Sequence, residues 1–212
     1  MIYKFTNTRT IACSITSDKL LMFLGKFVYA GGVAEYIGEY KNDRRHGFGR
    51  YFCDGGDSYE GDFMEGDFHG YGVLRCAEGG VYSGCWFLGK YHGKGHYEWR
   101  DGCSYNGDWV QGKMEGTGVY VFTDGAKYEG EFRDDAMDGF GIYYYSSGAW
   151  YEGYFSGGLK NGQGNYQWPN GDIYSGEWAC GKKDGYGVLN SHDGTILYEG
   201  FWSNGSRKWA KG

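Results

Sequence analysis

The sequence lacks several features that would place the protein in a membrane, on nucleic acid or outside the cell. No run of about 18 apolar residues is present, so no membrane-spanning helix is expected. The formal net charge is −6, which argues against a nucleic-acid partner because phosphates attract cationic proteins. The first residues do not combine a charged leader with a long apolar block, so a secretory signal is not expected and a cytoplasmic location is predicted.

Cysteine motifs and aliphatic residues are also scarce. The six cysteines include no C-x-x-C pair, and we expect all of them to be reduced thiols. Leucine, isoleucine and valine are few, whereas aromatic residues make up 20% of the chain, which has 22 tyrosines. The aromatic rings must therefore supply most of the buried apolar area.

The most informative feature of the sequence is its period. Tyrosine recurs every 23 residues through seven repeats, and an eighth follows after 24 residues. These residues are Tyr36, Tyr59, Tyr82, Tyr105, Tyr128, Tyr151, Tyr174 and Tyr198. A fixed period of this length predicts an array of stacked structural repeats.

Within each repeat, we number positions by their offset from this tyrosine. Offset 2 is always Gly, offset 4 is always aromatic, offsets 11 and 13 form a Gly-x-Gly pair, and offset 15 is Tyr or Leu. This alternation has a period of two, which is typical of strands. Offset 20 is Gly, often after Asp or Asn, and such dipeptides favour tight hairpin turns. Each repeat is therefore predicted to be a β-hairpin.

Joined hairpins predict an all-β fold: an elongated single-layer antiparallel array of hairpin repeats, twisted and curved, with about sixteen strands at ~4.8 Å spacing. The motif Y-x-G-x-(W/F/Y)-x-x-G-x-x-x-G-x-G-x-Y resembles the MORN repeat (membrane occupation and recognition nexus). The expected array covers residues 21–205, with full repeats over 36–197 and half-repeats over 21–35 and 198–205. Residues 1–20 are expected to be an N-terminal tail or cap, and residues 206–212 a C-terminal tail.

Three motifs suggest chemistry but have simpler explanations. His46, His69 and His92 share offset 10, yet equivalent positions in neighbouring repeats lie about 10 Å apart, too far to share a metal ion. Asp, Glu or Asn stands there in later repeats, which predicts a turn residue that hydrogen-bonds locally. The Gly-x-Gly pairs enter a strand, not a helix, so they are expected to serve packing and not phosphate binding. Ser191-His192-Asp193 is contiguous, so it cannot form a triad and is expected to be a turn. No catalytic, metal or cofactor site is expected.

The sheet face opposite the repeated tyrosines carries the candidate binding residues. Offsets 1 and 3 are mainly acidic, and offsets 12 and 14 are often apolar. The candidate partner-binding residues are Glu60, Asp62, Asp108, Glu129, Glu131, Phe48, Tyr71, Val73, Phe140, Ile142 and Tyr186. An apolar strip with an acidic rim is typical of a partner groove. Two alternatives are that a terminal segment covers this face, or that it is simply solvated.

The resemblance implies a non-enzymatic scaffold or adaptor that binds protein partners in a cytoskeletal, ciliary or axonemal assembly. An acidic and apolar groove would suit a basic amphipathic helix or peptide. One alternative is a membrane- or phosphoinositide-associated adaptor, which the net charge disfavours. The others are a regulatory subunit that acts in trans on an enzyme, and an end-to-end homodimer formed through edge strands near Trp202 and Trp209.

Overall fold

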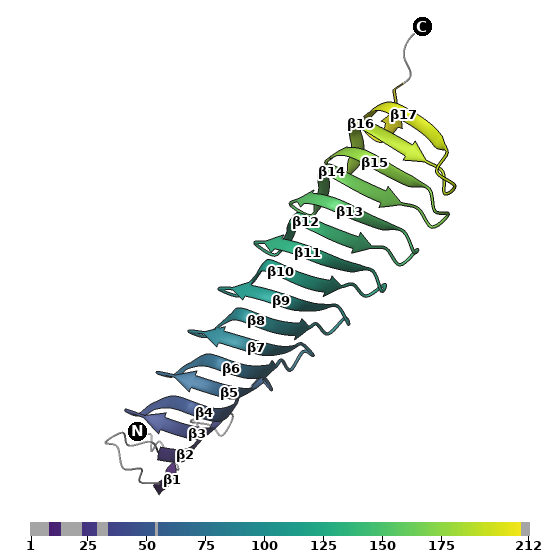
Figure 1. The fold of residues 1–212 in the computed structure, drawn as a ribbon. Helices are drawn as coiled ribbons and strands as arrows, with labels where there is room; N and C mark the ends of the chain where they lie inside the picture. The colour runs from purple at the N-terminus through teal and green to yellow at the C-terminus, as the bar shows by residue number, and fades with distance from the viewer. Residues whose placement is uncertain (1–8, 14–22, 29–33, 54, 209–212) are drawn as a thin grey trace, which may run out of the picture. The chain divides into compact units, whose positions relative to one another are not determined.

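The computed structural model describes residues 9–13, 23–28, 34–53 and 55–208 (Figure 1). It divides into two units. The first unit holds the residues up to Arg100 together with Trp109–Gly112. The second holds Asp101–Asp108 and the residues from Lys113 onward. The described residues contain no helix, and hence none that could span a membrane.

The strands follow one another at regular intervals within each unit. The first unit has β1 (Arg9–Cys13), β2 (Phe23–Val28), β3 (Glu35–Lys41), β4 (Arg44–Phe52), β5 (Ser58–Met64), β6 (Asp67–Arg75), β7 (Val81–Phe87) and β8 (Lys90–Glu98). β9 (Ser104–Val110) contributes residues to both units. The second unit has β10 (Lys113–Val121), β11 (Lys127–Arg133), β12 (Ala136–Tyr144), β13 (Trp150–Ser156), β14 (Leu159–Gln167), β15 (Ile173–Ala179), β16 (Lys182–Asn190), β17 (Ile196–Ser203) and β18 (Ser206–Arg207).

Each unit is an open antiparallel sheet in which every strand pairs with the next one along the chain (Figure 1). Each repeat contributes two strands, a first strand of about seven residues and a second of about nine. The predicted fold class, an all-β single-layer antiparallel array of hairpin repeats, is therefore confirmed.

Tight turns join the two strands of each repeat, at offsets 6 and 7. Both turn residues have positive φ, as in Glu65 (53°) and Gly66 (102°), which is the geometry of a type I′ turn. The Asp-Gly and Asn-Gly dipeptides also form turns between antiparallel strands, as predicted, since the N–H of Gly194 donates a hydrogen bond to the carbonyl of Ser191 at 2.9 Å, but these turns join successive repeats. They lie in longer loops between repeats, where the Asp193 carboxylate accepts a hydrogen bond from the N–H of Thr195 at 2.9 Å. A side chain that bonds its own backbone two residues on is a common use of Asp and Asn in loops.

A β-bulge follows the turn in six of the described hairpins. In the sixth repeat, Gly153 pairs with Gly164 and Phe155 with Lys160, so three residues of β14 lie opposite one residue of β13. Gly162, at offset 11, lies within this bulge with φ of +75°. The first glycine of each Gly-x-Gly pair therefore provides the bulge conformation, and the second provides the packing that the sequence predicted.

The repeated tyrosines form the core on one face of each sheet. Tyr128 is fully buried, and its ring makes edge contacts with Phe132 and Phe155 at centroid distances of 5.1 and 5.0 Å. A Cβ on Gly141 would come within 2.6 Å of its phenol carbon Cζ, so only glycine lets the ring lie on the strand. We call this side of each sheet the aromatic face and the opposite side the outer face.

The ends of the array show how the terminal segments pair. In β2, Gly25 pairs with Gly38 and Phe27 with Tyr36. This is the register of a second strand of a repeat, and β1 supplies its partner within the expected N-terminal tail. At the other end, β18 pairs with β17 although it lies in the expected C-terminal tail. Trp209, which the homodimer hypothesis invoked, lies outside the described residues.

Candidate protein-binding surface

Three of the predicted acidic residues have a structural task on the outer face. Asp62, Asp108 and Glu131 all occupy offset 3, where the bulge leaves backbone groups outside the strand ladder. The Glu131 Oε1 atom accepts a hydrogen bond from the N–H of Phe140 at 2.9 Å. Asp62 accepts the equivalent hydrogen bond from the N–H of Tyr71 at 3.1 Å. Asp108 accepts it from the N–H of Thr117 at 3.0 Å. These carboxylates close the bulge, and a partner role for them remains a prediction.

The other two predicted acidic residues form ion pairs. Glu60 binds the Arg50 guanidinium at 2.8 Å, and Glu129 binds the Lys127 ammonium at 2.6 Å. Both pairs are well exposed, so each contributes little to stability. Their negative charge is partly compensated within the chain, which weakens the acidic rim that the sequence predicted.

The predicted apolar residues lie on the outer face of both units. Phe48 and Tyr71 in the first unit are 50% and 60% exposed, and Val73 beside them is half-buried. Phe140, Ile142 and Tyr186 lie in the second unit, and the side chains of Phe140 and Tyr186 are each 43% exposed. Each unit therefore presents exposed apolar candidates on its outer face.

Two exposed aromatic residues were not predicted. Tyr154 and Phe201 occupy offset 3, where five other repeats carry the carboxylate that closes the bulge. Their rings are 53% and 65% exposed. The signal was present in the sequence, because an aromatic residue at an otherwise acidic position departs from the repeat.

These residues complete two aromatic pairs in the second unit. Phe140 lies directly across from Tyr154, with ring centroids 5.5 Å apart, and Tyr186 lies across from Phe201 at the same distance. The Tyr186 hydroxyl also donates a hydrogen bond to Glu199 at 2.7 Å, which raises the pKa of the phenol. Each pair forms a small apolar wall on the outer face.

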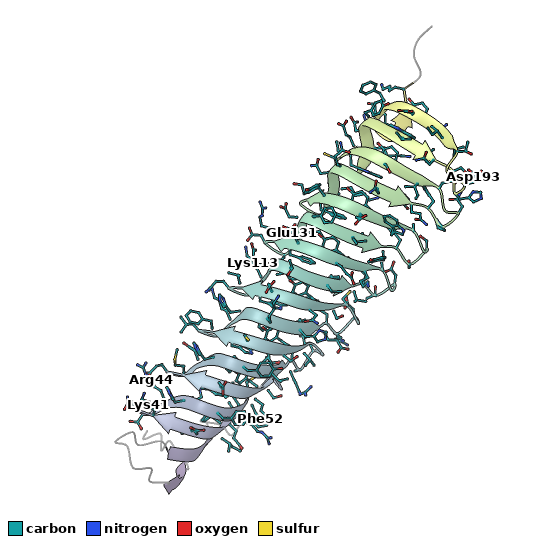
Figure 2. The ribbon with its side chains drawn as sticks, viewed as in Figure 1. Lys41, Arg44, Phe52, Lys113, Glu131 and Asp193 are labelled. Carbon is teal, nitrogen blue, oxygen red and sulfur yellow. The ribbon has the colours of Figure 1, made fainter. Side chains whose placement is uncertain are left out.

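A groove of about 520 Å³ lies between the two walls. Its floor is bare backbone at Gly153, Gly164, Gly176 and Gly187, because these residues have no side chain. Its rim consists of Phe140, Tyr154, Tyr186, Gln163, Asn165, Ser175, Glu152 and Glu177. Both charged residues on this rim are acidic. We call this feature the outer-face groove. Glu131, labelled in Figure 2, lies on β11, the strand next to the one that carries Phe140.

The three aligned histidines lie within strands and not in turns. His69 is the third residue of β6 and pairs with Asp62, so the predicted turn position is wrong. The Nδ1 atoms of His46, His69 and His92 are buried and have no hydrogen-bond partner among the described residues. In the second unit the same offset holds Glu115, Asp138, Asn161 and Asp184, and Asp184 accepts a hydrogen bond from the N–H of Asn204 at 2.9 Å. That bond joins one repeat to the turn of the next.

The remaining sequence motifs provide no further site. The described residues contain no group of three or more His, Cys, Asp or Glu side chains that could hold a metal ion. Cys53, Cys76, Cys85, Cys103 and Cys180 are free thiols. Ser191 and Thr195 close a loop by a backbone hydrogen bond of 2.8 Å, which confirms that Ser191-His192-Asp193 is a turn.

The regular succession of paired hairpins defines a repeat scaffold. The family model of the MORN repeat matches residues 36–58, 59–81, 82–104, 105–127, 128–150, 151–173, 174–196 and 198–208. The chain therefore belongs to the MORN-repeat family, as the sequence motif predicted.

Comparison with solved structures finds the SAS-4 (dCPAP) TCP domain in complex with a proline-rich motif of Ana2 (dSTIL) of Drosophila melanogaster. The TM-score is 0.47 at 11% sequence identity, and the alignment covers 74% of this chain and 85% of that chain. None of the curated proteins compared with the chain matches it.

Proposed function

We propose that the chain is a non-catalytic scaffold that binds a protein partner through the outer-face groove of its second unit. The observation that supports this most is the replacement of a structural carboxylate by an exposed ring at Tyr154 and Phe201. Tyr154 and Phe201 cannot accept the backbone hydrogen bond that the carboxylate accepts in other repeats. Because this bond is lost, we infer that the exposed rings serve a function other than stability. Exposed aromatic rings with a polar rim are typical of protein interfaces.

The chemistry of the groove favours a basic amphipathic helix or peptide as the partner segment. Tyr154 and Tyr186 lie three strands apart, which is about 14 Å, and a helix is about 10–12 Å wide. The apolar side of such a segment would lie on the aromatic walls. Its Lys and Arg side chains would lie near Glu152 and Glu177, and this charge complementarity favours a basic over an acidic segment.

The cellular setting is part of the same proposal. A cytoplasmic position within a cytoskeletal, ciliary or axonemal assembly rests on the family resemblance. The repeats occupy most of the sequence, which supports a scaffold over an enzyme.

The proposal can be tested with a fluorescein-labelled peptide of leucine and lysine in heptad order, measured by fluorescence anisotropy. Phe140→Gln combined with Tyr186→Thr introduces residues that other repeats carry at this offset, Gln163 and Thr117, so the fold should be retained. We expect the double variant to bind about tenfold more weakly than the wild type, because two aromatic anchors are lost.

Leu88→Gln is the matched control, because Leu88 is 54% exposed in a turn and Gln111 holds the same position in the next repeat. It should bind as the wild type does. Equal affinity of all three proteins, or equal loss in the control, would show that the groove does not bind such a segment.

A further inference from the structure

The aromatic face of the second unit carries three cations at one repeat position, offset 9. They are Lys160, Lys183 and Arg207, which we call the cationic row. The Lys160 Nζ atom lies 4.6 Å from the ring centroid of Tyr166 and 4.7 Å from that of Trp178. The two preceding repeats carry uncharged Met114 and Met137 at this offset, and in the first unit only Arg45 is charged there.

Lys183 and Arg207 share one aromatic ring. The Lys183 Nζ atom lies 4.2 Å from the ring centroid of Trp202, and the Arg207 Cζ atom lies 5.8 Å from it. Trp168 also contacts Lys183, at 4.9 Å. Such cation–π contacts stabilise a cation but leave its N–H groups able to donate to an anion.

No carboxylate balances the cationic row within the part of the chain that the structure describes. The ion pairs of the second unit are Lys113–Asp134, Lys127–Glu129 and Arg133–Asp138, and none involves these three residues. Burial, and then the charge of Lys183, lower the pKa of Lys160 to about 8. Burial, and then the charge of Arg207, lower the pKa of Lys183. The cations therefore repel one another, and an added anion would relieve that repulsion.

A hollow of about 370 Å³ lies beside Lys183 and Arg207. Trp168, Leu189 and Trp202 give it apolar walls, and Asn170 and Asp172 line its edge. Asp172 is the one acidic residue among them. Its Oδ1 atom accepts a hydrogen bond from the N–H of His192 at 3.1 Å, and its Oδ2 atom accepts one from Asn170 at 2.9 Å. The Asp172 carboxylate is thus engaged in the loop and does not pair with the cations.

We propose that Lys183 and Arg207, with Lys160 beside them, form an anion site that takes side-chain carboxylates of an acidic protein segment. A carboxylate would gain charge-assisted hydrogen bonds from both cations, while the tryptophan rings contact the apolar part of the segment. An anionic membrane fits less well, because Asp172 and Asp193 in the loops of this region would be repelled. This site lies on the opposite face from the outer-face groove and does not depend on the function proposed above.

The test uses the full chain and a fluorescein-labelled peptide of alternating glutamate and alanine, measured by fluorescence anisotropy. Lys183→Met with Arg207→Met removes both charges and introduces the residue found at Met114 and Met137. We expect affinity for the peptide to fall about tenfold, in line with the loss of charge-assisted hydrogen bonds. Peptide binding should also change the tryptophan fluorescence of the wild type but not that of the double variant, because Trp168 and Trp202 border the site.

Lys182→Met is the matched control, because Lys182 precedes Lys183 in β16 and its side chain lies on the opposite face. Its affinity should equal that of the wild type. If the double variant does not fold, as judged by circular dichroism, the peptide affinity of Arg207→Met alone is compared with that of the wild type and of Lys182→Met.

Three results would overturn the proposal. These are unchanged peptide binding in the charge-removal variants, an equal loss in Lys182→Met, and binding to phosphatidylserine-containing vesicles that exceeds peptide binding and depends on Lys183 and Arg207. The last result would assign the cations to a lipid headgroup. Displacement of the peptide by inorganic phosphate would support a site for anions.

Discussion

The Tyr128 hydroxyl donates a hydrogen bond to the backbone carbonyl of Glu131 at 3.0 Å. That carbonyl lies in the bulge, where the regular pairing of β11 and β12 is interrupted between Gly130 and Phe132. Every repeat makes the same bond from its tyrosine to the residue three positions on. The bond explains why offset 0 is tyrosine and not phenylalanine: the phenol satisfies a carbonyl that the bulge leaves outside the ladder.

Tyr128→Phe should therefore destabilise the protein by about 1–2 kcal/mol, because a buried bond is lost and its acceptor is left unsatisfied. The measurement is the free energy of unfolding from urea titration. Tyr143→Phe is the control, since the Tyr143 hydroxyl makes no hydrogen bond to the described residues, and its effect should be close to zero. Equal effects of the two substitutions would contradict this role of the hydroxyl.

Glu131→Ala should cost about 1 kcal/mol of stability, because the N–H of Phe140 loses its acceptor. Glu129→Ala, two residues away, should change stability little, since the Glu129–Lys127 pair is exposed. The same urea titration compares them. If both substitutions were neutral, the hydrogen bond from the N–H of Phe140 to Glu131 would not stabilise the bulge. The frequent acidic residue at offset 3 would then need another explanation.

His69→Asp should stabilise the first unit by about 1 kcal/mol. His69 has a buried Nδ1 atom without a partner, whereas Asp184 at the same offset accepts a turn N–H of the next repeat. An aspartate at position 69 is expected to accept the corresponding N–H of Leu88. The thermal midpoint and urea titration report the change, and a loss of stability would show that the histidine is better suited to this position.

Stability should rise with pH between roughly pH 7 and pH 9.5. The pKa of Lys160 is lowered to about 8, so the folded protein binds fewer protons than the unfolded chain above that value. At higher pH the trend reverses, because burial raises the pKa of Tyr174 to about 12 and only the unfolded tyrosines ionise near their ordinary pKa of 10. Lys160→Met should flatten the rise.

Lys113→Met is the control for this pH series. Lys113 is exposed, and its hydrogen bond with Asp134 raises the pKa of its ammonium group, so it should not titrate in this window. The urea midpoint at each pH is the measurement. An unchanged slope in Lys160→Met would mean that Lys160 is not the group responsible.

Much of the fold could be predicted from the sequence because the repeat determines the pairing. Tyrosine at offset 0 and glycine at offsets 2 and 13 predicted which face of the sheet is buried, and their regular recurrence predicted that consecutive strands pair. The turns between repeats carry the strong Asp-Gly and Asn-Gly signal, whereas the two-residue turns within repeats were missed because they use varied pairs such as Glu65-Gly66 and Cys180-Gly181. Only the register across strands shows that offset 11 belongs to a bulge.

The candidate site was harder to predict than the fold. Sequence alternation correctly placed Phe140 and Tyr186 on the outer face, but it treated all acidic residues there as equivalent. The backbone hydrogen bond of Asp62 depends on the bulge, so its structural task could not be read from its offset. Tyr154 and Phe201 were missed because they depart from the pattern that the repeats share.

The most direct test of the proposed function is site-specific photo-crosslinking in living cells. A benzophenone amino acid at position 154 should form adducts with a protein whose linked peptide is basic and amphipathic, and Phe140→Gln with Tyr186→Thr should abolish them. The same probe at position 88 should not form these adducts. Equal adducts from both positions, or linked peptides without Lys and Arg, would contradict the claim that the outer-face groove binds a basic partner segment.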